Sequence, residues 1–131
     1  MDIVIDASAI IAVLVNESKK ATLLRLTQGA QLLVPPSVPW EIGNAFSAML
    51  KRRRITTIEA IRAVEAYAKI PLRLVDVELT EAVRLAGQLN LYAYDAYLLR
   101  CAARYKAPLL SLDQDLVAAA TSLGLEVLEV E

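Results

Sequence analysis

Ile3-Val4-Ile5-Asp6-Ala7-Ser8 begins the chain with a short apolar run that ends in an acid and a hydroxyl. The run is continuous rather than alternating, which predicts a strand buried on both faces, as in a parallel sheet. Further short apolar runs follow, each separated from the next by segments of helical periodicity. Strands separated by helices imply parallel pairing through right-handed crossovers. We therefore expect one α/β domain over residues 1–131, with a parallel sheet of about five strands and helices on both faces.

Capping signals and apolar spacing delimit the expected elements. Thr56 and Glu59 form a capping-box signature, and Pro39 is placed in the first turn of the preceding helix. The expected strands cover 3–5, 32–34, 72–75, 109–112 and 126–130. The expected helices cover about 8–15, 19–28, 39–53, 56–70, 79–89, 95–106 and 113–123. In the helix that follows Thr56, we expect the core to be contacted by Ile58, Ile61, Val64 and Ala68.

The composition excludes several kinds of chemistry. Among 131 residues, 14 are Lys or Arg and 15 are Asp or Glu, so the formal charge of −1 excludes a polycation that coats nucleic acid but allows a local basic patch. The chain has no histidine, which excludes Ser-His-Asp and Cys-His catalysis and histidine metal sites. Its single cysteine, Cys101, can form neither an internal disulfide nor a thiolate zinc site. The remaining chemistry must use carboxylates, hydroxyls, Lys, Arg or a hard metal ion.

The sequence has no candidate membrane span. The apolar stretch Ala7–Val15 is far shorter than the roughly 20 residues that a spanning helix needs. Asp2 and Asp6 precede it with no positive charge, which is the wrong flank for a secretory signal. Together with the single cysteine, these features predict a soluble, cytoplasmic protein in a reducing compartment and no membrane partner.

Four carboxylates follow strands or begin helices: Asp6, Glu41, Asp95 and Asp113. Each one alone has an ordinary explanation, because acids in the first helical turn complement free N–H groups and the helix dipole. Together they suggest more, because ligands of an open parallel sheet bind outside the carboxyl ends of its strands. We therefore expect the four side chains to converge at that edge.

Converging carboxylates need a counter-charge. Two of them about 4 Å apart repel by roughly 4 kcal/mol at an effective dielectric constant of about 20. Gathering three or four without a cation would cost about as much as the whole stability of a small domain. Oxygen-only ligands select Mg²⁺ or Mn²⁺, and Mg²⁺ is typically held by one or two carboxylates together with substrate phosphate. This pattern suits hydrolysis of a phosphodiester.

The order of these residues resembles the PIN domain family. The resemblance rests on Asp6-Ala7-Ser8 after a strand, Glu41 with Asn44 one turn later, Asp95 at the start of a helix, and Ser111-Leu112-Asp113 near the end. It covers essentially the whole chain and is greatest for the VapC-like ribonuclease toxins of prokaryotic toxin–antitoxin pairs. It implies a PIN-like sheet flanked by helices, a homodimer, a cognate antitoxin and an endoribonuclease that depends on Mg²⁺ or Mn²⁺ and cleaves RNA with metal-activated water.

The resemblance also implies a role for individual residues. Asp6, Glu41, Asp95 and Asp113 match the catalytic acids of the family, with Asp6, Asp95 and Asp113 as metal ligands. Glu41 would orient the attacking water or share a second ion. The supporting positions are Ser8, Ser111 and Asn44, and Asp115 is an additional carboxylate that could act as an outer ligand.

RNA-binding residues are less well defined by the sequence. Lys51, Arg52, Arg53 and Arg54 form the only basic run, and Arg100 and Arg104 form a second strip one helical turn apart. Both sets could attract phosphate, although cations at a helix C-terminus also complement its dipole. Tyr92, Tyr94 and Tyr97 surround Asp95 and could stack on bases, or else pack in the core or in a dimer contact.

Other functions compete with nuclease activity. The first is a PIN-like module that binds RNA or protein without cleavage, which sequence alone does not separate from an enzyme. A phosphotransferase with an aspartyl nucleophile of the haloacid-dehalogenase type needs an acid two residues after Asp6, where Ser8 stands. A receiver-type regulator needs a lysine where Ser111 stands. Both phosphotransfer alternatives are therefore disfavoured.

Overall fold

A four-stranded parallel sheet forms the centre of the computed structural model, which describes all residues 1–131. Its strands are β1 (Asp2–Ile5), β2 (Gln31–Val34), β3 (Leu72–Leu74) and β4 (Leu109–Leu110), in the order β3-β2-β1-β4. Val4 of β1 pairs with Leu33 of β2 on one side and with Leu109 of β4 on the other. Ile3, Val4 and Ile5 are all buried, as the continuous apolar run predicts for a central strand.

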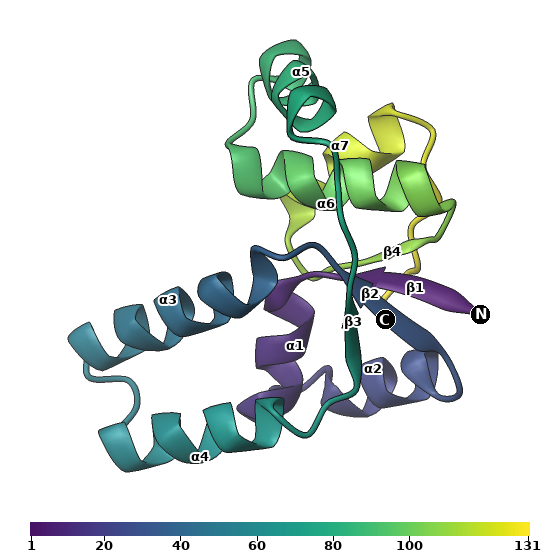
Figure 1. Ribbon diagram of the computed structural model, residues 1–131. Coiled ribbons are helices and arrows are strands. Elements are labelled where there is room, and N and C mark those ends of the chain that lie inside the picture. The colour runs from purple at the N-terminus through teal and green to yellow at the C-terminus, as the bar shows by residue number, and fades with distance from the viewer.

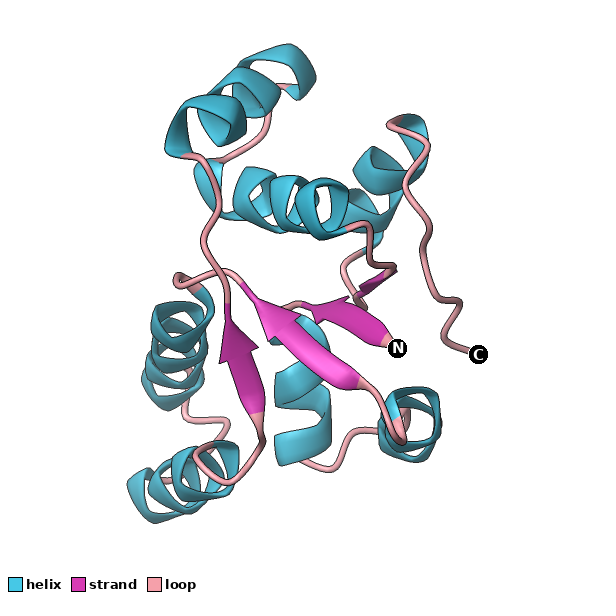
Figure 2. Cartoon of the chain, turned by 45° about the vertical axis from the view of Figure 1, so that its right-hand side comes forward, coloured by secondary structure: helices cyan, strands magenta, loops and turns pink.

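Seven helices cover the two faces of the sheet. Figures 1 and 2 show α5, α6 and α7 on one side and α1 to α4 on the other. The α/β class and the flanking helices are therefore confirmed. The helices are α1 (Ala7–Leu14), α2 (Lys20–Thr27), α3 (Val38–Lys51), α4 (Thr57–Tyr67), α5 (Leu79–Leu89), α6 (Ala93–Tyr105) and α7 (Gln114–Ser122).

The fifth strand, expected over 126–130, is not formed. Val127 makes a single parallel bridge to Leu109, with Leu109 N–H donating to the Glu126 carbonyl and Leu128 N–H donating to the Leu109 carbonyl. The partner strand β4 has only two residues, because the chain leaves the sheet at Ser111, whose side chain turns toward Asp6. So short a strand leaves no room for a longer ladder.

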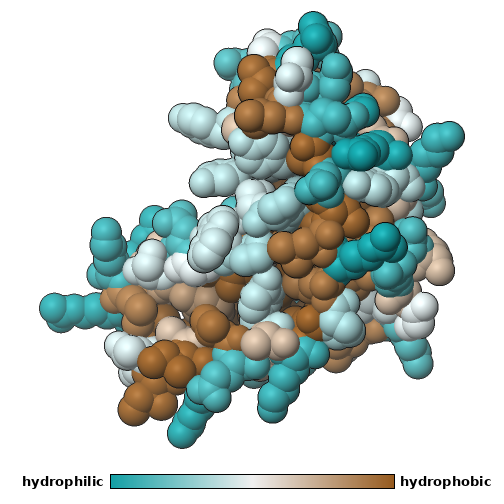
Figure 3. Space-filling view, in the orientation of Figure 1, coloured by the Kyte–Doolittle hydropathy of each residue, from teal (hydrophilic) through white to brown (hydrophobic).

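The buried face of α4 is also different from the expected one. Ala60 and Ala63 are buried, whereas Ile58, Ile61 and Val64 are 65%, 54% and 42% exposed and Ala68 is exposed too. Helix α4 packs against α1 and α3 rather than on the sheet, and small side chains allow that close approach. The large apolar side chains are left at the surface, and Figure 3 shows apolar atoms gathered over the arm that α3 and α4 form.

None of the seven helices combines the length and the apolar character that a bilayer crossing requires.

Candidate active site

The beginnings of four helices lie at one edge of the sheet. Because all strands are parallel, β1, β2 and β4 end at the same edge, and each leads directly into a helix: α1, α3 and α7. Helix α6 leads into β4 and runs in the opposite direction, so its first turn returns to that edge (Figure 1). This topology brings together the four chain segments that carry the predicted acids.

Asp6 is the most enclosed of these acids. Its side chain caps α1 by accepting the Ala9 N–H at 3.1 Å, and only 4% of the residue is exposed. It also accepts the hydroxyls of Ser8 at 2.7 Å and Ser111 at 2.6 Å. Ser111 comes from the loop after β4, so this carboxylate joins two chain segments more than a hundred residues apart.

The two serine hydroxyls have fixed directions. Ser8 Oγ accepts the Leu112 N–H at 3.0 Å, and Ser111 Oγ accepts the Asp113 N–H at 2.9 Å. Because a backbone N–H already donates to each hydroxyl, each hydroxyl proton is free to be given to Asp6. The Ser8 hydroxyl lies within hydrogen-bond distance of both Asp6 oxygens, at 2.7 and 2.9 Å, while the Ala9 N–H donates to Oδ1 and the Ser111 hydroxyl to Oδ2. Both carboxylate oxygens are thus held by donors of the protein.

The pKa of Asp6 reflects two opposing influences. Burial raises the pKa of the carboxyl, and the hydrogen bonds from Ser111, Ser8 and Ala9 lower it, while the negative charge of Asp113 raises it further. Burial dominates, so the pKa of Asp6 is raised. The protein therefore holds this group by hydrogen bonds that favour its ionised form, in a place where ionisation is costly.

Glu41 and Asp95 complete the electrostatic cluster. Glu41 is in the first turn of α3 and its Oε2 accepts the Ser37 hydroxyl at 3.1 Å. Burial raises the pKa of Glu41, and the charges of Asp6 and Asp95 raise it further. Burial also raises the pKa of Asp95, in the first turn of α6, with further contributions from Asp113, Asp6 and Asp115. Each acid is thus within electrostatic reach of others from different helices.

Asp113 and Asp115 lie at the exposed side of this cluster. Asp113 caps α7 by accepting the N–H groups of Asp115 at 3.0 Å and Leu116 at 3.2 Å. Both acids are exposed, and both add negative charge near Asp95. Asp113 therefore caps α7 and also contributes to the acidic cluster that the sequence predicts.

No basic side chain neutralises the cluster. The ion pairs of the protein involve Glu78 and Glu81 with Arg84, Arg100 and Arg104, and none reaches the converging acids. The acids also do not form a closed cage of three or more ligands within one coordination sphere. An oxygen-only site of this open kind fits Mg²⁺, which keeps several waters and takes only one or two carboxylates. It does not fit zinc, which prefers cysteine sulfur and histidine nitrogen, because the chain has no histidine and its one cysteine, Cys101, is buried in the core.

The other predicted site residues lie at different distances from the acids. Asn44 is exposed on α3, one turn after Glu41. The run Lys51–Arg54 is exposed at the opposite end of α3, roughly 15 Å from Glu41 along the helix axis. The RNA-binding role of this run stays a prediction.

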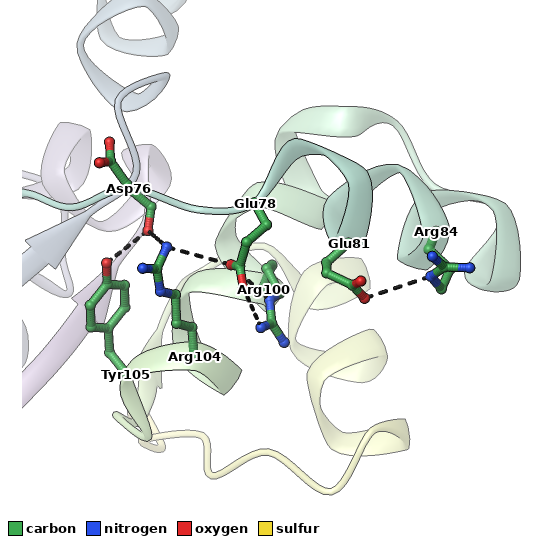
Figure 4. A network of polar contacts seen from close by, with 7 residues as sticks. All are labelled: Asp76, Glu78, Glu81, Arg84, Arg100, Arg104 and Tyr105. Atoms are coloured by element: carbon green, nitrogen blue, oxygen red, sulfur yellow. Dashed lines mark hydrogen bonds and ion pairs between the residues drawn. The ribbon is translucent and has the colours of Figure 1, made fainter.

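Arg100 and Arg104 have protein partners. Arg100 donates to both carboxylate oxygens of Glu78, at 3.2 and 2.7 Å, and Arg104 donates to the Asp76 carbonyl at 2.9 Å. Figure 4 shows this network between α6 and the segment that leads into α5. Their RNA-binding role also stays a prediction, and the structure gives both arginines a structural role.

Ser37 is a site residue that the sequence reasoning missed. It precedes Glu41 by four residues, the spacing at which side chains on adjacent helical turns meet, and this spacing could have identified it. Glu78 was missed because its partner Arg100 is 22 residues away and no local pattern connects them.

The structure is similar to several solved structures. PAE2754 from Pyrobaculum aerophilum superposes with a TM-score of 0.71 at 22% identity, over 94% of this chain and 86% of that one. VapC20 from Mycobacterium tuberculosis, a toxin described as cleaving the sarcin–ricin loop, has a TM-score of 0.64 at 17% identity, over 89% and 94% of the two chains. VapBC2 from Rickettsia felis, bound to a promoter DNA fragment, gives 0.64 at 12% identity over 98% of both chains.

No curated protein matches the sequence of this chain. The family model of the PIN domain, however, matches residues 3–121. That range contains all the converging acids and every helix except the last residue of α7. The chain therefore belongs to the PIN domain family.

Proposed function

We propose that this protein is a divalent-metal-dependent endoribonuclease, the toxin of a toxin–antitoxin pair. One observation carries the proposal: four helix starts bring Asp6, Glu41, Asp95 and Asp113 to one edge of the sheet, and no basic side chain of the protein neutralises them. Membership of the PIN domain family and the similarity to VapC20 and VapBC2 support the same function.

Asp6, Asp95 and Asp113 are the residues that would hold Mg²⁺ or Mn²⁺, directly or through the waters that the ion keeps. When bound, the ion offsets the clustered negative charge and lowers the pKa of the water that attacks the phosphodiester. Asp6 enters this site with a fixed orientation, because Ser8 and Ser111 both donate to it. Asp115 adds an exposed carboxylate at the rim, suited to an outer position.

Glu41 is suited to accept the proton of the attacking water. Its Oε2 accepts the Ser37 hydroxyl, and its Oε1 makes no hydrogen bond within the protein. Its raised pKa moves it toward the range in which a carboxylate is an effective general base near neutral pH. Asn44, exposed one turn later on α3, would supply a supporting amide beside Glu41.

Helix dipoles assist the binding of phosphate. The first turns of α1, α3, α6 and α7 point their N-terminal ends toward this edge. A helix N-terminus carries roughly half a positive charge and is a common site for phosphate. Asp6 and Asp113 cap α1 and α7, so the starts of α3 and α6, which have no side-chain cap, are the ones suited to attract an anionic substrate.

Exposed apolar surface supports protein partners. Ile58, Ile61 and Val64 are exposed on α4, and Leu79 and Val83 are 62% and 56% exposed on α5. The mean hydropathy of +0.45 is high for a small domain. We propose that a homodimer contact and a cognate antitoxin cover these faces, in the cytoplasm of a prokaryote.

The test is cleavage of defined RNAs by the purified protein with Mg²⁺, with Mn²⁺, and with a chelator. We expect cleavage at specific positions with either ion and none with the chelator. Cleavage that resists the chelator would contradict the metal requirement. RNA binding with no cleavage under any of these conditions would instead favour a non-catalytic module.

A further inference from the structure

A small cavity adjoins the candidate active site. It has a volume of about 190 Å³ and is lined by Pro35, Pro36, Ser37, Asp76, Val77 and Tyr97. These residues come from the β2–α3 loop, from the segment between β3 and α5, and from α6. The cavity therefore opens at the same edge of the sheet as the acids.

One contact places the cavity beside a proposed catalytic residue. Ser37, which lines it, donates to Glu41 at 3.1 Å. Tyr97, which also lines it, lies on α6, the helix whose first turn carries Asp95, although side chains two residues apart on a helix point to different faces. The cavity therefore lies next to Glu41, where the base of a nucleotide that adjoins the reacting phosphodiester would need a place.

The wall of the cavity has flat, apolar surfaces. Two proline rings, Val77 and the Tyr97 ring line it. The rings of Tyr94 and Tyr97 pack edge to face, with centroids 6.1 Å apart and an interplanar angle of 71°. Tyr97 is half-buried. A tyrosine ring is a stacking surface for a base, and such stacking does not depend on the base's identity.

Asp76 supplies a hydrogen-bond acceptor in a rigid segment. Its backbone carbonyl accepts Arg104 Nη1 at 2.9 Å and the Tyr105 hydroxyl at 2.7 Å. Two residues later, Glu78 holds Arg100 and Arg104. Figure 4 shows the Asp76 carboxylate directed away from this network, with no interaction drawn to it. The network thus fixes the backbone and leaves the carboxylate free.

We propose that this cavity binds one base of the RNA substrate and that Asp76 favours guanine there. Guanine presents two adjacent N–H donors, N1–H and the N2 amino group, which a carboxylate accepts together. Adenine and cytosine each offer an amino group beside a ring acceptor, and uracil flanks its only N–H with two carbonyls. A base is uncharged, so it can lie beside Asp76, where a phosphate group would be repelled. This inference rests on the proposed nuclease function.

The test compares short single-stranded RNAs that differ at one position beside the cleavage site, with Mg²⁺ present. We expect the wild-type protein to cleave the guanine substrate about tenfold or more faster than the uracil substrate, as kcat/KM. Asp76→Asn should lose most of this preference, because its kcat/KM falls more on the guanine substrate than on the uracil substrate. Asp2→Asn makes the same change at the first residue of β1, at the edge of the sheet opposite to the acids, and should keep the preference. Tyr97→Leu should raise KM for every base alike.

Two results separate this inference from the function on which it rests. If the wild-type protein cleaves RNA and Asp76→Asn leaves its base preference unchanged, the base site is wrong and the nuclease function stands. Binding of labelled guanine- and uracil-containing tetranucleotides to Asp95→Asn, measured by anisotropy, tests the site without cleavage. We expect tighter binding of the guanine form, lost when Asp76→Asn is added. Equal binding of the two forms would contradict the proposal.

Discussion

Glu78 and Asp95 both lie at the start of a helix on the same side of the sheet, but their surroundings carry opposite charge. Glu78 occupies the N-cap position of α5 without a capping side-chain hydrogen bond, and it contacts Arg100 and Arg104, which lower its pKa to about 2. Asp95, in the first turn of α6, has burial and three other acids around it, which raise its pKa. Only four residues separate Asp95 from Arg100, the nearer of the two arginines on the same helix.

The difference shows where the chain supplies its own counter-charge and where it does not. At Glu78, the arginines satisfy the carboxylate and join α6 to the segment before α5 (Figure 4). At the sheet edge, Asp6, Glu41 and Asp95 repel one another and no arginine or lysine pairs with them. A carboxylate cluster without an internal cation is a candidate site for an external one.

The largest effect that this comparison predicts is on catalysis. Asp95→Asn removes one charge with little change of shape, and its side chain makes no hydrogen bond that the change would break. We expect the rate of RNA cleavage to fall roughly a thousandfold while RNA binding is kept. Asp95 would hold the ion, and stabilisation of charge at the reacting phosphate makes the largest contribution to the rate. Asp2→Asn should cleave normally. Cleavage by Asp95→Asn within tenfold of the wild-type rate would contradict the assignment.

The second prediction concerns stability in the presence of metal. A ligand that binds only the folded state stabilises it by about 2.7 kcal/mol at a hundredfold excess over Kd. We expect Mg²⁺ or Mn²⁺ to raise the Tm of the wild-type protein and of Glu78→Gln, and to raise the Tm of Asp95→Asn much less. An equal rise in Asp95→Asn would show that the ion binds elsewhere.

The third prediction is the pH dependence of the metal-free protein. The folded-state pKa values of Asp6, Glu41 and Asp95 are raised, so the folded state holds more protons than the unfolded chain just above the usual carboxyl range. Stability then decreases as the pH rises through that window. With a chelator present, we expect a higher Tm near pH 5 than near pH 7, and a smaller difference in Asp95→Asn. A Tm that rises steadily to pH 7 in both proteins would argue against the cluster.

The smallest effect concerns Glu78, the carboxylate that the arginines neutralise. The pKa of Glu78 is lowered to about 2, so its contribution is present above its unfolded pKa and is lost as the pH falls toward 2. Glu78→Gln should lower the Tm by a few degrees near pH 7, and the two proteins should converge in acid. Because the group is exposed, the effect is small. Its dependence on Mg²⁺ should be that of the wild type.

Local patterns were sufficient to predict most of the fold. The unbroken run Ile3-Val4-Ile5 identified the central strand, and the Thr56–Glu59 capping box identified the start of α4. The buried face of α4 could not be predicted, since alternating alanines and large residues give it two apolar faces, and only the packing against α1 and α3 selects Ala60 and Ala63. The length of the last strand depended on how soon β4 turns away, which is decided by Ser111 and its distant partner Asp6.

The candidate site was predictable where local signals decide it, and not where contacts between distant segments do. The positions of Asp6, Glu41, Asp95 and Asp113 after strands or at helix starts follow from local signals and parallel topology. The serine bridge between β1 and β4, the arginine pair on Glu78 and the free carboxylate of Asp76 depend on contacts between distant segments. Side-chain partners of that kind leave no periodic trace in a single sequence.

The most direct test of the central claim is calorimetric titration of the RNA-free protein with Mn²⁺. We expect saturable binding to the wild-type protein and to Asp2→Asn, and loss of most of that binding in Asp95→Asn. No binding to the wild-type protein at millimolar Mn²⁺, or equal binding to Asp95→Asn, would contradict the claim that these acids take their counter-charge from a divalent cation.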